Sequence, residues 1–233
     1  MKNAILIVIS IVAIATSAFA QQTTETKPKS APIRHTLDYY ISGGYSFPHN
    51  TQYLKDYGYH GSYNALAGFG YEKSDMTTII LEAQYNKFDF DPKKYIRSCN
   101  QTGTAANGDI FIYSLTLGFK RKLTINYGNF SPYFKANFWI MHEIFDKINV
   151  SLVREDSIFD EFGEFVVVQK RDSVYTLPTA TSSSLTAHLA LGVDYHLHGS
   201  WYLFSECRYC ICFTKGETTN YIPISVGILY RRK

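Results

Sequence analysis

Hydrophobic and polar residues alternate along eight separate segments of this chain. Successive side chains of a β-strand point to opposite sides, so a period of two places apolar residues on one face and polar or mixed residues on the other. The alternating segments cover residues 37–47, 63–71, 79–85, 111–119, 134–140, 185–195, 201–211 and 222–230. The pattern therefore predicts eight β-strands, each with one apolar face and one mixed face.

The breaks between these strands differ in length on the two sides of the predicted sheet. The odd-numbered breaks cover 49–61, 91–108, 147–184 and 214–219, and the even-numbered breaks cover 73–76, 121–131 and 198–200. Three of the four odd breaks are longer than every even break, and long extracellular loops with short periplasmic turns are typical of outer-membrane barrels. We therefore predict an all-β fold, an eight-stranded antiparallel up-and-down transmembrane β-barrel.

The longest break, 147–184, contains two apolar runs of its own, at 148–153 and 165–168. We expect these runs to form a hairpin that continues the two flanking strands beyond the membrane. Between and beside them lie five carboxylates, Glu155, Asp156, Asp160, Glu161 and Glu164. A divalent-cation site would need regularly spaced ligands, which this stretch lacks, so the prediction is a solvated loop tip.

The N-terminus has the layout of a secretory signal peptide. Lys2 provides a basic start, residues 4–15 form an apolar core, and Ala18 and Ala20 are the small residues expected before a cleavage site. The predicted regions are a signal peptide over 1–20, a disordered periplasmic leader over 21–36 and an outer-membrane β-barrel domain over 37–233. The alternative for the first region is an uncleaved membrane anchor. The first interpretation implies export to the bacterial outer membrane.

Composition fits this location and argues against nucleic-acid binding. The chain has 19 tyrosines and 16 phenylalanines, and aromatic residues line both interfaces of membrane barrels. Its formal net charge is only +3, and the basic residues are dispersed rather than gathered into a stripe.

Alternation alone does not say which face points outward, because a soluble lipocalin-like barrel has the same pattern with the faces inverted. The apolar face ends in aromatic residues at several strand ends: Tyr39, Phe47, Tyr63, Tyr71, Trp201, Tyr209 and Tyr230. The mixed face carries charges near the middle of the strands: Glu82, Lys135, Asp194, Glu206 and Arg208. Each charge would cost a few kcal/mol in lipid. We therefore predict that the apolar face meets lipid and that these five residues form a structural polar cluster inside the barrel.

Four cysteines occur in this exported chain, so a disulfide is permitted. Cys207, Cys210 and Cys212 form a CxxCxC run, but in a strand Cys207 faces away from the other two, and no metal site is predicted. A bridge from Cys99 to Cys210 or Cys212 and unpaired thiols both stay open.

Several short stretches resemble the small outer-membrane barrels of the OmpA transmembrane-domain and OmpX type. They are Gly43-Gly44 on the first strand, Pro132-Tyr133, Glu206-Cys207-Arg208-Tyr209 and the closing Val226-Gly227-Ile228-Leu229-Tyr230. The resemblance covers nearly the whole mature chain. It implies an eight-stranded barrel whose last strand carries an aromatic residue read by the barrel-assembly machinery, here Tyr230.

The predicted function is a structural or surface-interaction role, with an interior plugged by polar side chains and long extracellular loops. Eight strands leave too narrow a bore for an open pore. No cofactor is expected, and the predicted partners are outer-membrane lipid, the assembly machinery and an extracellular ligand bound by the loops of a monomer.

Two other functions remain as alternatives. The first is an outer-membrane lipid-modifying enzyme, in which His188 would be the base and Ser184, Glu143 and His142 its companions. We expect instead that His188 is an interior residue hydrogen-bonded to the plug, that Asp194, His196 and His198 lie toward the periplasmic turn, and that no catalytic residue is present. The second alternative is a soluble periplasmic lipocalin-like carrier.

Overall fold

The computed structural model of the chain describes residues 36–49, 58–98, 102–106, 108–124, 128–159, 165–214 and 218–232. The predicted signal peptide lies outside the described residues, as does the predicted leader except for Thr36. Cys99 also lies outside them. Among the helical segments that are described, none has the length and hydropathy needed to span a membrane.

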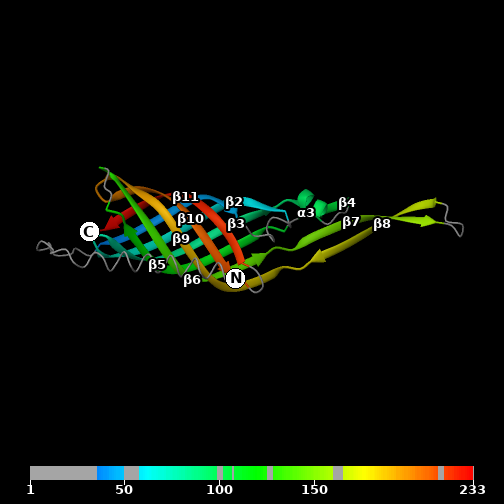
Figure 1. Ribbon diagram of the computed structural model, residues 1–233, viewed down its shortest axis with the longest axis horizontal. Helices are drawn as coiled ribbons and strands as arrows, with labels where there is room; N and C mark the ends of the chain where they lie inside the picture. Colours follow the sequence, from blue (N-terminus) through cyan, green and yellow to red (C-terminus); the bar gives the residue numbers. More distant parts are fainter. Residues whose placement is uncertain are drawn as a thin grey trace, which may run out of the picture. The chain divides into compact units, whose positions relative to one another are not determined.

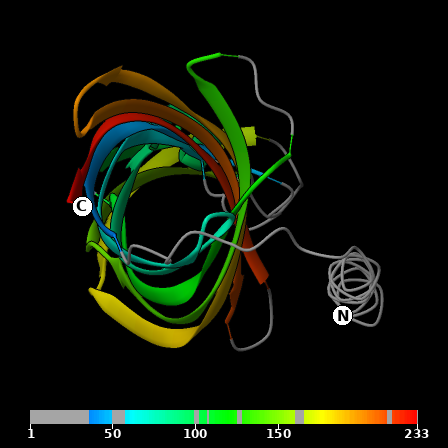
Figure 2. The ribbon, with the colours of Figure 1, turned by 90° about the vertical axis from the view of Figure 1, so that its left-hand side faces the viewer.

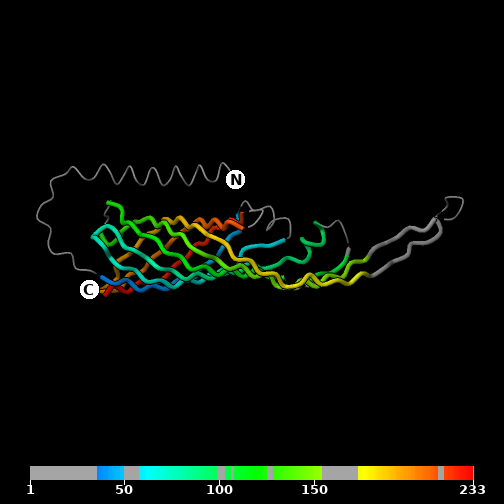
Figure 3. Tube along the Cα trace, turned by 90° about the horizontal axis from the view of Figure 1, so that it is seen from below, coloured from blue at the N-terminus to red at the C-terminus, as the bar shows by residue number. Residues whose placement is uncertain are grey.

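Eight antiparallel strands close into a barrel, as the alternation predicted (Figure 1). They are β1 (Leu37–Pro48), β2 (Tyr59–Ser74), β3 (Thr77–Phe90), β5 (Ile110–Lys122), β6 (Phe130–Phe145), β9 (Ala180–His198), β10 (Trp201–Phe213) and β11 (Thr218–Arg232). Their order around the barrel follows the chain, and β11 pairs with β1 to close it. Figure 2 shows the resulting ring of strands, and Figure 3 shows that the strands run obliquely beside one another.

The apolar face of each strand points out of the barrel, as predicted. Along β3, Ile79 and Leu81 are exposed, whereas Thr78, Ile80 and Glu82 between and beside them are buried. The same alternation runs along the other barrel strands, except that three consecutive residues are exposed at 43–45 of β1 and at 138–140 of β6. A pattern with polar residues inside and apolar residues outside is the reverse of the arrangement in a soluble barrel.

Short connections join the strands at one end of the barrel. Ser74 and Thr77 flank the turn between β2 and β3, and the Ser74 hydroxyl accepts a hydrogen bond from the Thr77 amide at 3.1 Å. Between β9 and β10 the chain turns through Gly199 and Ser200, where Gly199 has a φ of 58°. A two-residue hairpin turn requires this left-handed backbone, which glycine adopts without steric cost.

The longer connections at the other end contain structure that the sequence pattern did not predict. Helix α3 (Pro92–Ser98) follows β3, and the Asp91 carboxylate accepts hydrogen bonds from the Lys93 and Lys94 amides at 3.0 and 3.1 Å. Proline in the first turn after an aspartate cap is a common way to begin a helix.

A separate three-stranded sheet is built from β4 (Thr102–Ala106), β7 (Ile148–Phe159) and β8 (Phe165–Leu177), in the order β4-β7-β8. Strands β7 and β8 are the hairpin predicted within 147–184, although longer than expected, and β4 was not predicted. The prediction that the acidic residues all lie at a loop tip is wrong for Glu155 and Asp156, which are in β7. The other three, Asp160, Glu161 and Glu164, lie outside the described residues.

The barrel interior is apolar at the end where these longer connections lie. There a buried cluster joins inward-facing strand residues to α3 and β7: Tyr59, Phe88, Phe90, Tyr95, Ile96, Ile110, Ile112, Met141, Ile148, Val150, Cys210, Cys212 and Tyr221. The expectation of a polar interior therefore does not hold over this part. The physical reason is that Tyr95 and Ile96 of α3 bring apolar side chains against the inward face, so apolar residues are buried on both sides.

Candidate functional site in the barrel lumen

Four charged residues of the predicted interior cluster meet in the lumen. Glu82 comes from β3, Lys135 from β6, and Glu206 and Arg208 from β10. Each occupies an inward position of its strand, and all four are at least 96% buried. Because adjacent inward positions of β10 are two residues apart, Glu206 and Arg208 reach the lumen side by side.

These four residues alternate in charge. Lys135 Nζ lies 2.7 Å from Glu82 Oε1 and 2.6 Å from Glu206 Oε2. The Arg208 guanidinium lies 3.3 Å from Glu82 Oε2, and its Nε donates to Glu206 Oε1 at 3.0 Å. Each cation thus touches both carboxylates, and the cluster has no net charge. Burial of ions is tolerated only with this degree of pairing.

Neutral side chains complete the hydrogen bonding of the cluster. Tyr40 donates to Glu82 at 2.8 Å, and Tyr133 donates to Glu206 at 3.0 Å. Arg208 Nη1 donates to Gln84 Oε1 at 2.7 Å, and Asn137 donates to Glu82. The sequence reasoning missed these four residues. The alternation does put Gln84 and Asn137 on the mixed, inward face of their strands. Tyr40 and Tyr133 also occupy inward positions in that alternation, which is the sequence signal that could have identified them.

Asp194 does not join the other four predicted residues. It accepts hydrogen bonds from Lys120 Nζ at 2.8 and 2.6 Å, and both side chains are buried. The Lys120 ammonium also lies 3.8 Å from the centre of the Tyr133 ring. Tyr133 therefore stands between this pair and the four-residue cluster.

Further ion pairs lie toward the end of the lumen with the short turns. Arg231 binds Asp38 through two hydrogen bonds of 2.8 and 2.9 Å. Lys122 lies 2.9 Å from Glu72. Paired charges thus lie in the inner part of the lumen, and the apolar cluster described above lies in the outer part.

The residues named for the enzyme alternative, His188 and its three companions, are not joined by hydrogen bonds to one another. His188 is buried in the lumen, and neither ring nitrogen has a hydrogen-bond partner among the described residues. The prediction that His188 is hydrogen-bonded to the plug is therefore wrong. His142 is exposed and bonds Ser183 at 2.8 Å, Glu143 is buried, and Ser184 contacts the Leu185 carbonyl at 3.4 Å. Ser184, the serine of the predicted set, thus bonds a backbone carbonyl, and His142 bonds the hydroxyl of Ser183, a serine outside that set.

The cysteines of β10 divide between the two faces as predicted. Cys207 is exposed, Cys210 and Cys212 are buried, and all three are free thiols. Thr186 Oγ1 lies 3.5 Å from Cys212 Sγ. Within the described ranges, no three His, Cys, Asp or Glu side chains are placed to hold a metal ion.

The geometry defines a small closed membrane-type barrel, and known structures of that kind are similar to it. Neisserial surface protein A has 11% identity and a TM-score of 0.47, with 84% of this chain and 96% of that chain covered. Ail, the attachment invasion locus protein of Yersinia pestis, crystallised with the heparin analogue sucrose octasulfate, has 15% identity and a TM-score of 0.46, with 86% and 100% covered.

The N-terminal β-barrel domain of Pseudomonas aeruginosa OprF has 8% identity and a TM-score of 0.44, with 86% and 100% covered. Comparisons with protein-family models and with curated proteins found no match.

Proposed function

We propose that this protein is a bacterial outer-membrane β-barrel with a structural or surface-interaction role and no enzymatic activity. The observation that carries the proposal is the band of exposed apolar side chains around a barrel whose charges are buried. Examples from different strands are Ile41, Leu81, Leu117, Leu191 and Val226, all at least 40% exposed. In water this surface would be an aggregation hazard, whereas in a bilayer it is the surface required.

The side chains inside the lumen support a role other than conduction. Paired charges occupy the lumen around Lys135 and Lys120, and an apolar cluster around Phe88 and Tyr221 occupies the outer part. An ion crossing this barrel would have to displace both. The proposed plug is therefore polar toward the periplasm and apolar toward the outside.

The proposed interaction surface lies on the segments joining β3 to β5 and β6 to β9. These segments contain α3, β4, β7 and β8, and they include exposed apolar residues such as Val174, Tyr175 and Leu177. Exposed aromatic and aliphatic side chains on a loop are typical of contact sites. In this proposal outer-membrane lipid surrounds the barrel wall. The barrel-assembly machinery inserts the chain, and the protein is a monomer.

Membrane fractionation of cells expressing the full chain tests the proposal. We expect the protein to resist carbonate extraction, to require detergent, and to migrate faster on a gel without boiling than after boiling. Release by carbonate or salt alone would support the soluble carrier instead and would overturn the proposal. For the enzyme alternative, His188→Ala should leave the lipid composition of the membrane unchanged, and an altered lipid profile would contradict a non-enzymatic role.

A further inference from the structure

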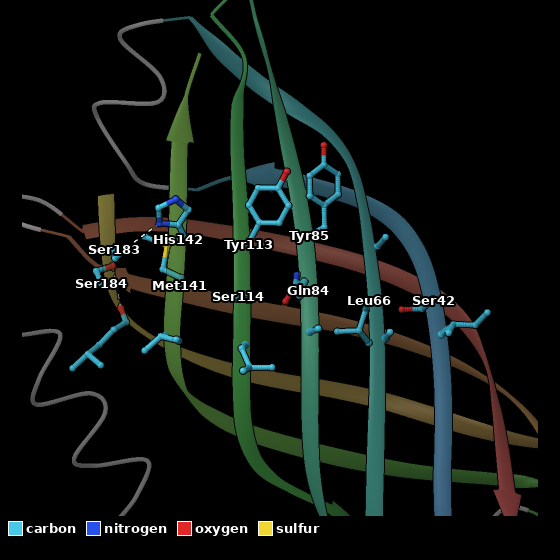
Figure 4. A pocket seen from close by; sticks show the side chains of 17 residues that line it. Ser42, Leu66, Gln84, Tyr85, Tyr113, Ser114, Met141, His142, Ser183 and Ser184 are labelled. Carbon is cyan, nitrogen blue, oxygen red and sulfur yellow. Dashed lines mark hydrogen bonds between the residues drawn. The ribbon is translucent and has the colours of Figure 1, made fainter. Parts of the chain in front are cut away.

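An elongated groove of about 910 Å³ runs across six neighbouring strands of the barrel wall, β1, β2, β3, β5, β6 and β9 (Figure 4). Its lining comes from three successive rows of strand register. The middle row, Ser42, Leu66, Gln84, Ser114, Met141 and Ser184, consists of residues paired strand to strand. These residues have the inward parity, so from outside their backbone forms the floor of the groove.

The two rows beside the middle row point outward and form the walls. One wall contains Tyr85, Tyr113 and His142, which are consecutive register partners. The other wall contains Ile41, Leu115 and Ile140, which are all exposed. In the same two rows, Ala65, Ala67 and Ala83 have side chains too short to form a wall, so at these positions they extend the floor of the groove. The groove is therefore an apolar depression in the outward face.

The two ends of the groove lie at different levels along the barrel axis, and therefore at different depths in the membrane. Ser184 lies 14 residues before His198, the inner end of β9, whereas Ser42 lies five residues after Leu37, the inner end of β1. Five strand spacings of about 4.8 Å give a path of about 24 Å. With strands tilted by about 40°, that path descends about 15 Å, which is the hydrocarbon depth of one leaflet.

The shallow end of the groove is polar. His142 Nδ1 and Ser183 Oγ are 2.8 Å apart there, and both residues are exposed (Figure 4). An imidazole N–H and a serine O–H are hydrogen-bond donors, and donors of this kind suit the oxygens of a phosphate group. At the deep end the outward-facing side chains, those of Ala67 and Ile41, are apolar. The polarity of the groove thus matches a lipid whose phosphate lies at the outer interface and whose acyl chain runs toward the middle of the bilayer.

We propose that this groove binds one phosphate-headed lipid of the outer leaflet, with an acyl chain along the alanine floor and the phosphate at His142 and Ser183. The proposal rests on the proposed function, since the groove lies in the wall assigned to the membrane. Its continuity with that lipid-facing wall, and the match of the hydrogen-bond donors at one end to a phosphate headgroup, select a lipid over a protein segment. A lipid held in this way is a bound ligand with a defined orientation.

Native mass spectrometry of the detergent-purified full chain tests this proposal, with palmitoyl-oleoyl-phosphatidylglycerol as the probe. We expect one lipid per barrel in the parent protein. Ala83→Trp and Ala67→Trp fill the floor and should weaken retention about tenfold. The matched control is Ala136→Trp, which also faces outward but does not line the groove, and it should retain the lipid.

The polar end needs its own comparison. A diacylglycerol with the same acyl chains lacks the phosphate, and the parent protein should prefer phosphatidylglycerol over it. The double variant His142→Ala with Ser183→Ala should lose this preference while keeping the acyl-chain contact. Equal lipid retention in all tryptophan variants would overturn the proposal, as would a protein dimer that only the floor variants dissociate.

Folding is checked in every variant by heat-modifiable gel migration. A heat-modifiable, detergent-requiring protein that retains no lipid would refute the groove proposal and leave the proposed function intact. A protein that carbonate extracts would refute the proposed function first.

Discussion

The side-chain ammonium of Lys120 lies 2.6 Å from Asp194 Oδ2, and both groups are buried in the lumen. In the part of the chain that the structure describes, Asp194 is the one carboxylate that bonds Lys120. Lys135, by contrast, lies between two carboxylates, those of Glu82 and Glu206. The two buried lysines should therefore respond differently when a partner is lost.

Asp194→Asn leaves the Lys120 charge buried without its counter-ion. We expect a loss of about 3–5 kcal/mol in the free energy of unfolding, because the desolvation cost of the remaining ion is no longer offset. Urea titration of the barrel in phospholipid vesicles measures this loss. Replacing both partners, with Lys120→Met and Asp194→Leu, should recover most of it; a double variant no better than the single one would contradict an ion-pair origin.

Glu82→Gln should be milder than Asp194→Asn. Lys135 keeps the carboxylate of Glu206 at 2.6 Å, and the glutamine amide keeps an oxygen that accepts the Tyr40 hydrogen bond. The expected loss is about 1.5–3 kcal/mol, the value of hydrogen bonds to charged groups. The same urea titration compares the two variants. If Glu82→Gln were the more damaging substitution, the cluster would depend on Glu82 more than its geometry indicates.

The sequence predicted the strands well because their signal is local. Exposed Ile79 and Leu81 alternate with buried Ile80 and Glu82, and that parity can be read from neighbouring residues alone. The parity also placed Glu206 and Arg208 inside, and it placed Cys207 opposite Cys210 and Cys212. Pairing between strands is different, because it depends on how far each strand is shifted along its neighbours.

The shift between neighbouring strands explains why the sequence pattern grouped Asp194 with Lys135 and Glu82, whereas in the structure Asp194 bonds Lys120. Parity puts Asp194, Lys120 and Lys135 in the lumen, but only the register sets their level along it. The apolar outer part of the lumen escaped prediction for a similar reason. The inward residues Phe88, Ile110 and Ile112 are apolar there because Tyr95 and Ile96 of helix α3 pack against them. A helix of seven residues is too short to show a sustained helical period in the sequence, so this packing could not be predicted.

Adjacent glycines in β1 provide a steric test of the register. A Cβ on Gly44 would meet the Ile224 carbonyl of β11, whereas a Cβ on Gly43 would have its nearest neighbour, the Asn64 carbonyl oxygen, at 3.7 Å. We expect Gly44→Ala to cost about 1–3 kcal/mol through overpacking. Gly43→Ala is the matched control, and it should stay within about 0.5 kcal/mol of the parent in the same titration. Equal costs would mean that the β1–β11 pairing is misplaced.

The lipid-facing assignment predicts a depth-dependent cost for an added charge. Leu117 is exposed on the outer face of β5, and Leu117→Arg should destabilise the barrel by about 2–4 kcal/mol if it lies near the bilayer midplane. Leu123 is also exposed but follows the last residue of β5, so Leu123→Arg should cost about 0–1 kcal/mol. Refolding yield and urea titration in vesicles give both values, and equal tolerance of the two arginines would argue against lipid at Leu117.

Maleimide labelling of the β10 cysteines tests which side chains lie on the outer face and which lie in the lumen. In a Cys99→Ser background, a charged maleimide added in water should label none of the remaining cysteines, since Cys210 and Cys212 are buried and Cys207 faces lipid. A lipid-soluble maleimide should label Cys207 alone, and all three should react after unfolding. Mass spectrometry counts the additions. Labelling of Cys210 by the charged reagent would mean that water reaches the outer lumen.

The first and last barrel strands are partners, with Leu37 opposite Arg232 and Pro48 opposite Tyr221. Until β11 is synthesised, β1 and β10 each carry a row of peptide groups with no hydrogen-bond partner, a state that hydrocarbon does not tolerate. Closure of the barrel therefore has to wait until β11 is available to pair with β1. A chain truncated before Thr218 would keep two unpaired strand edges, on β1 and β10, and would need a chaperone to prevent aggregation through them.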